Sequence, residues 1–198
     1  MRQQILGLFL SILVFVSVCG VGYSQWNDII EIHTTMRFGN LTLRFVGSPS
    51  CSDNDDAKDV GETTCEYDNL DPEVGGFKTL KVSITNSYPS CEAHCTFTLQ
   101  NVGTFTEEVK NIVMKPGAGL ITGETYVDAV GRIVGWQLID AITNEPKLKV
   151  YIYDGTGSSL VTHVLDLKEL LPGSMTVRVE ENAGQCSTYS FEVEIAYE

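Results

Sequence analysis

The chain has 198 residues, of which 26 are acidic and 13 basic, so its formal net charge is −13 at neutral pH. This length fits one ordinary domain, and a negative field of this size repels nucleic acid and anionic lipid headgroups. Hydrophobic residues make up 43 % of the chain, which excludes a disordered acidic tail. The composition therefore predicts a folded, acidic domain that does not bind nucleic acid.

Residues 1–24 are expected to form a secretory signal peptide. Arg2 supplies a positive charge, and residues 5–18 are almost entirely apolar. The small residues Gly22 and Ser24 then precede a possible cut before Gln25, which is the usual layout of such a signal. A retained membrane anchor is the alternative, because the apolar stretch is nearly long enough to span a bilayer. Cleavage predicts a secreted mature chain that makes no membrane contact.

Alternation of apolar and polar side chains dominates the rest of the sequence. Within residues 78–86, Leu80, Val82 and Ile84 share one face, which is typical of an antiparallel strand packed on a core. The same pattern recurs at residues 96–101, 147–154, 174–180 and 189–196. Clusters of turn-forming residues separate these runs.

Only residues 166–171 have the pattern of a short helix, which Pro172 would end. No linker or low-complexity stretch divides the mature chain. We therefore predict an all-β fold: a single antiparallel β-sandwich of the jelly-roll type with one short helix.

Five cysteines remain after Cys19 is assigned to the signal peptide, which suggests two disulfides and one odd thiol in an exported chain. Cys51 and Cys65 are the preferred pair because their disulfide would close a polar, acidic loop. Cys91 and Cys95 cannot pair along a straight strand, since four residues of strand span about 13 Å. They would pair only across a turn, or one of them would pair with Cys186.

No catalytic constellation is recognisable, so we expect neither an enzyme nor a cofactor. The turn-forming sequence that begins at Asp154 resembles a protease signature only in permuted order, and it predicts a glycine-rich turn. A zinc site built from Cys91, His94 and Cys95 lacks the usual ligand spacing. The adjacent acids Glu107 and Glu108 are expected to be solvated.

Two binding sites are weaker candidates. An acidic loop concentrates oxygen ligands of the kind that calcium prefers, although it departs from the EF-hand pattern and a solvated loop is the alternative. The calcium candidates are Asp53, Asp55, Asp56, Asp59 and Glu62. Asn40 begins a glycosylation sequon, with an ordinary strand segment as the alternative.

The start of the mature chain, residues 25–35, has the pattern of an apolar strand without an internal turn. Trp26, Ile30 and Ile32 share one face. Such a strand either completes its own sandwich or adds to an open sheet edge of a neighbouring copy. Donation from each copy to the next would not close on itself, so a filament would result. The candidate donor residues are Gln25, Trp26, Ile29, Ile30 and Ile32.

A set of motifs occurs in order over most of the mature chain. It comprises Trp26-Asn-Asp28, Phe38-Gly-Asn-Leu-Thr-Leu43, Leu70-Asp-Pro72, residues 80–89 and 97–104, Ile112-Val-Met114, Leu171-Pro-Gly173 and residues 189–195. Together these motifs resemble the TasA/camelysin family of extracellular fibre subunits, and most closely the archaeal bundling pilins related to TasA.

The resemblance implies a jelly-roll subunit whose N-terminal strand, here about residues 25–35, fills a groove of the next subunit. The five cysteines depart from the family pattern. The metalloprotease activity described for camelysins is not carried over, because no zinc-protease constellation is present.

These observations predict a structural subunit of an extracellular pilus or biofilm-matrix fibre. Its parts would be a signal peptide (residues 1–24), a donor strand (25–35) and a jelly-roll domain (36–198), and its partners would be further copies and neighbouring filaments. The alternative is a monomeric secreted β-sandwich that binds carbohydrate or cell wall. Tyr88, Trp136 and Tyr153 would then serve the sugar, although core packing also explains each of them.

Overall fold

The computed structural model of the chain describes residues 7, 9–17, 42–53 and 61–197. The chain divides into two compact units, residues 1–38 and residues 39–198. In the first unit, residues 9–17 form an α-helix with exposed side chains, and the Ser17 hydroxyl donates a 2.8 Å hydrogen bond to the Leu13 carbonyl. Among the described residues, no helix has both the length and the hydropathy needed to cross a bilayer.

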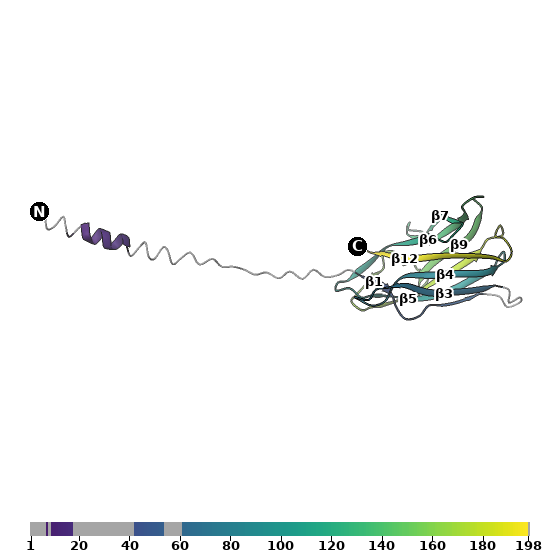
Figure 1. Cartoon of the computed structure of the whole chain (residues 1–198), viewed down its shortest axis with the longest axis horizontal. Coiled ribbons are helices and arrows are strands. Elements are labelled where there is room, and N and C mark those ends of the chain that lie inside the picture. The colour runs from purple at the N-terminus through teal and green to yellow at the C-terminus, as the bar shows by residue number, and fades with distance from the viewer. Residues whose placement is uncertain (1–6, 8, 18–41, 54–60, 198) are drawn as a thin grey trace. The chain divides into compact units, whose positions relative to one another are not determined.

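The second unit is built from strands that pair only in antiparallel fashion (Figure 1). The strands are β1 (Leu43–Phe45), β2 (Ser50–Asp53), β3 (Glu62–Leu70), β4 (Phe77–Ser87), β5 (Glu92–Asn101), β6 (Glu107–Pro116), β7 (Leu120–Val127), β8 (Ile133–Asp140), β9 (Pro146–Asp154), β10 (Val164–Leu165), β11 (Leu170–Val179) and β12 (Ser187–Tyr197). The predicted all-β, antiparallel fold is confirmed.

The strands form one curled sheet in the order β10-β6-β12-β4-β1-β5-β11-β9-β8-β7, with β3 added to β4 and β2 added to β5. Strand β1 joins the two halves, because Phe45 pairs with Phe77 of β4 and with Leu99 of β5. The first half contains β10, β6, β12, β4 and β3. The second half contains β5, β2, β11, β9, β8 and β7. Side chains from both halves meet in a single hydrophobic cluster, as in a sandwich.

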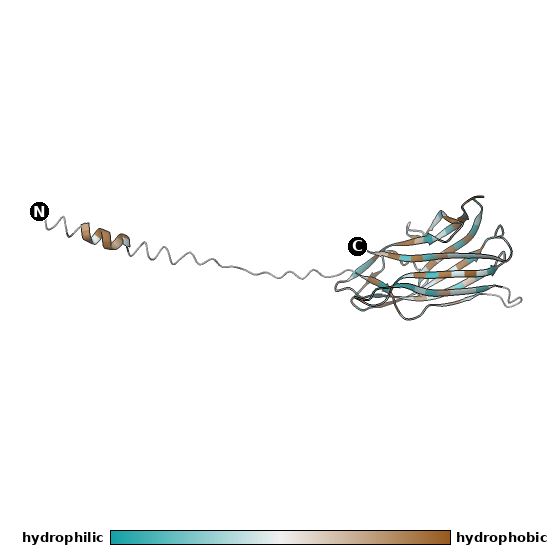
Figure 2. Cartoon of the chain, viewed as in Figure 1, coloured by the Kyte–Doolittle hydropathy of each residue, from teal (hydrophilic) through white to brown (hydrophobic). Residues whose placement is uncertain are grey.

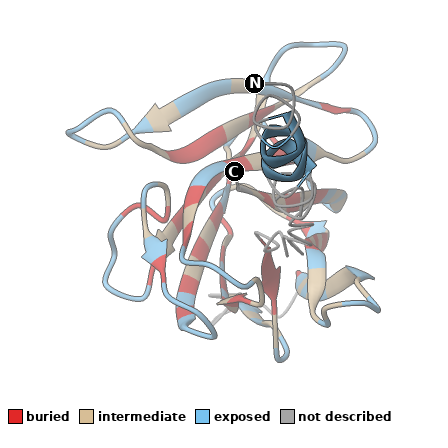
Figure 3. Ribbon diagram, turned by 90° about the vertical axis from the view of Figure 1, so that its left-hand side faces the viewer, coloured by how far each residue is buried: buried red, intermediate tan, exposed pale blue. Residues whose placement is uncertain are grey.

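The alternating pattern of the sequence is realised in this cluster. On β4, Leu80, Val82 and Ile84 are at most 1 % exposed. Figure 2 shows the alternation of polar and apolar residues along the strands, and Figure 3 shows where residues become buried. Burying each such aliphatic side chain contributes about 1.5–3 kcal/mol, so the alternation in sequence becomes the main stabilising term of the fold.

The helix predicted over residues 166–171 is absent: the segment forms a turn and then enters β11. Tertiary hydrogen bonds to Asn101 replace the helical ones. The Asn101 side chain donates to the Leu165 carbonyl at 3.0 Å, and the Asn101 carbonyl accepts from the Lys168 amide at 3.0 Å. Lys168 has a φ of 61°, which no α-helical residue adopts.

Candidate functional site

A seam runs between β2 and β3, where the two halves of the sheet meet through side chains. Tyr67 of β3 stacks on Phe45 with 5.4 Å between ring centroids, and its ring lies 5.6 Å from that of Phe77. Its hydroxyl accepts a 3.2 Å hydrogen bond from the Thr98 amide of β5. Burial raises the pKa of Tyr67 and outweighs this hydrogen bond, so the phenol stays neutral and holds β3 against the other half.

Three cysteines gather at the same seam. Cys51 of β2 lies directly opposite Cys95 of β5, with 4.1 Å between their Cα atoms. Cys65 of β3 faces Cys51 from the other half of the sheet, with 5.9 Å between Cα atoms. The Sγ atom of Cys51 lies within bonding distance of both partners, and the three Sγ atoms lie within 4.8 Å of one another. The sequence analysis predicted the pair Cys51–Cys65, but it did not place Cys95 beside them.

The other described cysteines, Cys91 and Cys186, are not part of this cluster. Cys91 is buried just before β5, on the same side of the chain as Cys95, and Cys186 is exposed. Because the chain from Cys91 to Cys95 is extended, a disulfide between them is excluded by strand geometry, as the sequence analysis anticipated.

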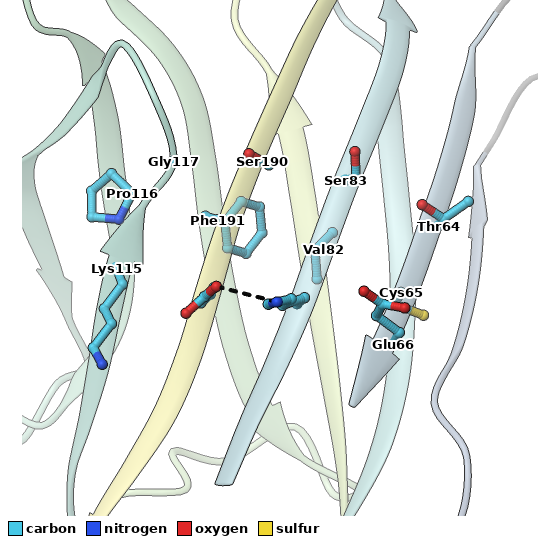
Figure 4. A pocket seen from close by; sticks show the side chains of 12 residues that line it. Thr64, Cys65, Glu66, Val82, Ser83, Lys115, Pro116, Gly117, Ser190 and Phe191 are labelled. Carbon is cyan, nitrogen blue, oxygen red and sulfur yellow. Dashed lines mark ion pairs between the residues drawn. The ribbon is translucent and has the colours of Figure 1, made fainter. Parts of the chain in front are cut away.

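A shallow groove crosses the outer face of β3, β4, β12 and β6 beside the seam (Figure 4). Its volume is about 540 Å³, and Cys65 is one of its lining residues. Lys81 and Glu192 face each other across it with 3.8 Å between the charged atoms, and Glu66 and Lys115 complete a balanced set of charges. The charged lining of the groove therefore suits a polar peptide segment better than the apolar face predicted for residues 25–35.

The outer edge of β7 is the longest open edge of the second half. Among the described residues, β7 pairs with β8 alone, and it is the last strand in the sheet order. Ile121 and Val127 on this strand are 43 % and 56 % exposed. In the adjoining turns, Val130 and Ile142 are also exposed. An unpaired backbone flanked by apolar side chains is a surface to which another strand can add.

A ladder of three tyrosines lies on the outer face of the second half. Tyr126 of β7 and Tyr151 of β9 both pair with Gly135 of β8, and their rings stack with centroids 5.3 Å apart. The missing side chain of Gly135 makes room for this contact, since an added Cβ would lie 2.8 Å from the Tyr151 ring. Tyr153 continues the stack, with its ring 6.5 Å from that of Tyr151. Of these three tyrosines, the sequence analysis named only Tyr153 as a candidate sugar-binding residue.

One acidic residue is buried against expectation. Glu107 is 1 % exposed, and among the described residues neither of its carboxylate oxygens has a hydrogen-bond partner of good geometry, although the Thr42 backbone lies near it. Glu108 forms an ion pair with Lys110 at the surface. Burial raises the pKa of Glu107 and outweighs the opposite effects of Lys110 and the Thr42 backbone. The prediction that both acids are solvated is therefore wrong for Glu107.

The glycine-rich segment after β9 is a turn, as predicted. The Asp154 carboxylate accepts hydrogen bonds from the amides of Thr156 and Ser158, both at 2.8 Å. Burial by itself raises the pKa of Asp154, but these hydrogen bonds and the Thr156 hydroxyl outweigh it and hold the pKa below its ordinary value. Asp154 therefore organises its own turn.

The remaining predicted residues divide between described and undescribed segments. Trp136 is buried in the hydrophobic cluster, and Tyr88 is partly buried and packs against that cluster. Asp53 ends β2 and Glu62 begins β3. Lying outside the described residues are Asp55, Asp56 and Asp59 of the calcium candidate, the sequon residue Asn40, and Gln25, Trp26, Ile29, Ile30 and Ile32 of the donor candidate.

Comparison of the chain with protein-family models, with characterised proteins and with solved structures finds no match. The fold and the local geometry therefore have to support any function on their own.

Proposed function

We propose that the chain is a structural subunit of an extracellular fibre. Residues 25–35 of each copy would add as a strand to the open edge of β7 in the next copy. The contact would be head-to-tail and would repeat without closing, so that a filament grows. The motifs that resemble those of fibre subunits motivate this proposal.

The observation that carries the proposal is the open edge of β7. Among the described residues this strand pairs with β8 alone, and its side chains Ile121 and Val127 are exposed. A strand from another copy would satisfy the unpaired backbone of this edge and bury its own apolar face there.

The dimensions of the two partners agree. Eleven extended residues span about 36 Å, which is enough to cover the eight residues of β7, about 26 Å long. Two register shifts bend β7 between Thr122 and Thr125 and between Tyr126 and Val127. Such bulges disrupt regular pairing locally, so the added strand would have to follow these bends.

Lateral bundling of filaments would follow from contacts between outer faces. Subunits with a net charge of −13 repel one another. At physiological ionic strength the screening length falls to about 8 Å, which permits such contacts.

The donor is tested by negative-stain electron microscopy of the secreted chain. We expect long fibres from the unaltered chain and isolated particles from a version that lacks residues 25–35. Ile30→Asp places a charge on the expected buried face and should also abolish fibres. Asn27→Asp adds the same charge on the opposite face and should leave them intact. Fibres from the deleted chain would overturn the donor assignment.

The acceptor is tested on the edge strands. Ile121→Asp places a charge on the edge of β7 and should prevent assembly. Leu70→Asp changes an exposed apolar residue at the end of edge strand β3, and it should assemble normally. Loss of fibres in Leu70→Asp, with assembly retained in Ile121→Asp, would move the acceptor to the β3 edge.

The tyrosine ladder favours a second candidate function, carbohydrate binding on a flat face. Stacked aromatic rings provide apolar surface with polar hydroxyls at its rim, which suits a sugar ring. Tyr151→Ala should abolish retardation of the protein in gels that contain a cell-wall polysaccharide. His94→Ala, on the same face, should not alter it. Equal mobility with and without polysaccharide for the unaltered chain would exclude this function.

A further inference from the structure

We infer that Cys51, Cys65 and Cys95 form a site of intramolecular thiol–disulfide exchange, in which Cys51 alternates between the other two partners. This inference is independent of fibre assembly. It rests on the mutual distance of the three Sγ atoms, within 4.8 Å, and on the placement of their strands.

The valence of sulfur makes the two contacts of Cys51 alternatives. A cysteine forms one disulfide at a time, so in the oxidised protein one of the three sulfurs remains a thiol. The Cα separation of Cys51 and Cys65, 5.9 Å, lies in the middle of the range that disulfides occupy. The separation of Cys51 and Cys95, 4.1 Å, lies just below that range. The resting bond is therefore Cys51–Cys65, with Cys95 as the thiol.

The exchange step is balanced without any oxidant. The Cys95 thiolate attacks the Sγ atom of Cys51, the Cys51–Cys95 bond forms and the Cys51–Cys65 bond breaks. Cys65 leaves as a thiolate and takes a proton from water, equivalent to the proton that Cys95 gave up. The number of disulfides does not change.

Exchange alters both the cross-link and the exposure of the remaining thiol. The Cys51–Cys65 bond joins β2 to β3 across the seam between the two halves of the sheet. The Cys51–Cys95 bond joins β2 to β5, which are already hydrogen-bonded neighbours. The thiol moves from Cys95, which is 1 % exposed, to Cys65, which is only partly buried on edge strand β3. A protected thiol thus becomes one that an external sulfur compound can reach.

A metal centre is the competing use of the same three residues. Tetrahedral zinc sites place four ligands at fixed distances from the ion, and structural sites are closed by a fourth protein ligand. In the described residues the cluster contains the three cysteines alone, and the His94 side chain is directed to the outer face, where Thr176 bonds it. Exchange therefore explains the arrangement more completely.

The test is mass-spectrometric mapping of the full chain, purified without reductant. Acid quenching and pepsin digestion at low pH prevent scrambling during analysis. We expect Cys51–Cys65 as the main linkage at the start. Prolonged treatment of the folded protein with iodoacetamide at pH 8 should trap Cys65 and enrich the Cys51–Cys95 linkage at least tenfold.

Two variants make the result specific. Cys95→Ser removes the attacking sulfur, so Cys65 should remain linked to Cys51 and unlabelled. Cys186→Ser removes an exposed cysteine outside the cluster and should behave as the unaltered chain does. A linkage map of the unaltered chain that does not change during labelling would overturn the inference. One equivalent of bound zinc with all three cysteines unlinked would also overturn it, in favour of a metal site.

Discussion

The guanidinium of Arg44 and the carboxylate of Asp71 lie 2.7 Å apart, although Arg44 occupies the central strand β1 and its side chain is only 6 % exposed. Arg44 also donates to the Leu43 carbonyl, and Lys78 approaches Asp71 to 3.3 Å. The pair anchors the turn after β3 to the strand that joins the two halves of the sheet.

The Arg44–Asp71 pair predicts a loss of stability in acid. The hydrogen bond from Arg44 is the main reason why the pKa of Asp71 falls to about 2, below its ordinary 3.8. A carboxyl with a lowered pKa stabilises the folded state above its unfolded pKa and ceases to do so as the pH falls from about 4 to about 2. Asp71→Asn should lower the melting temperature at pH 7, and its difference from the unaltered chain should shrink towards pH 2.

A surface pair provides the control for Asp71. Asp68→Asn breaks an ion pair with Lys81 in which both side chains are more than a third exposed. Ion pairs between exposed side chains contribute little to stability, so the melting temperature of this variant should be close to that of the unaltered chain. Equal melting temperatures for Asp71→Asn and Asp68→Asn at pH 7 would contradict a structural role for Arg44.

Glu107 should be a destabilising residue at neutral pH. Both of its oxygens are buried, and no well-formed hydrogen bond reaches them from the described part of the chain, so replacement by an apolar side chain of similar length removes a desolvation cost. Glu107→Met should raise the free energy of unfolding by about 1–3 kcal/mol at pH 7. Its neighbour Glu108, which is partly exposed, offers the control Glu108→Met, expected within about 0.5 kcal/mol of the unaltered chain.

The gain from Glu107→Met should depend on pH. Because the pKa of Glu107 is raised by folding, the folded state holds the proton more tightly. Stability of the unaltered chain therefore falls as the pH rises from the unfolded pKa through the folded one. Urea unfolding at pH 4 and pH 7 should show the larger gain at pH 7. A gain that is the same at both values would mean that Glu107 does not titrate in this range.

Asn101 should be among the most sensitive polar positions. Its buried side chain donates to the Phe105 and Leu165 carbonyls, at 2.7 and 3.0 Å, and accepts from the Gly103 amide at 2.9 Å. Asn101→Ala removes this partner from the buried Leu165 carbonyl and from the partly buried Phe105 and Gly103 groups, which should cost about 3 kcal/mol in denaturant unfolding.

The neighbouring residue Gln100 provides the control for Asn101→Ala. Gln100→Ala removes a single exposed hydrogen bond to the Lys168 carbonyl, so it should cost no more than about 1 kcal/mol. If the two variants unfold alike, the loops at this end of the sandwich do not depend on Asn101.

Gly135 should not accept a side chain. An added Cβ would lie 2.6 Å from the Val150 carbonyl oxygen and would separate the rings of Tyr126 and Tyr151. Gly135→Val should destabilise the fold by about 1–3 kcal/mol, as overpacking does. It should also reduce tyrosine near-ultraviolet dichroism. Gln137→Val, two residues along the same strand and face, should leave the dichroism unchanged.

Local alternation predicted the strands in which every second residue is strongly apolar. β4, β9 and β12 were expected because residues such as Leu80, Val150 and Phe191 recur with period two. β3 was not expected, since its inward residues Thr63 and Cys65 are only partly apolar. The cysteine cluster and the tyrosine ladder gave no local signal, because their members come from strands distant in the sequence.

The sequence by itself determined the all-β class, because the two-residue alternation of side chains along a strand can be recognised from a few consecutive residues. Tertiary structure alone decided that residues 166–171 form a turn, because the bonds to Asn101 join segments more than sixty residues apart. It likewise brought Cys95 to Cys51 across 44 positions and buried Glu107. Burial and proximity depend on which strands become neighbours, and strand order is a property of the whole chain.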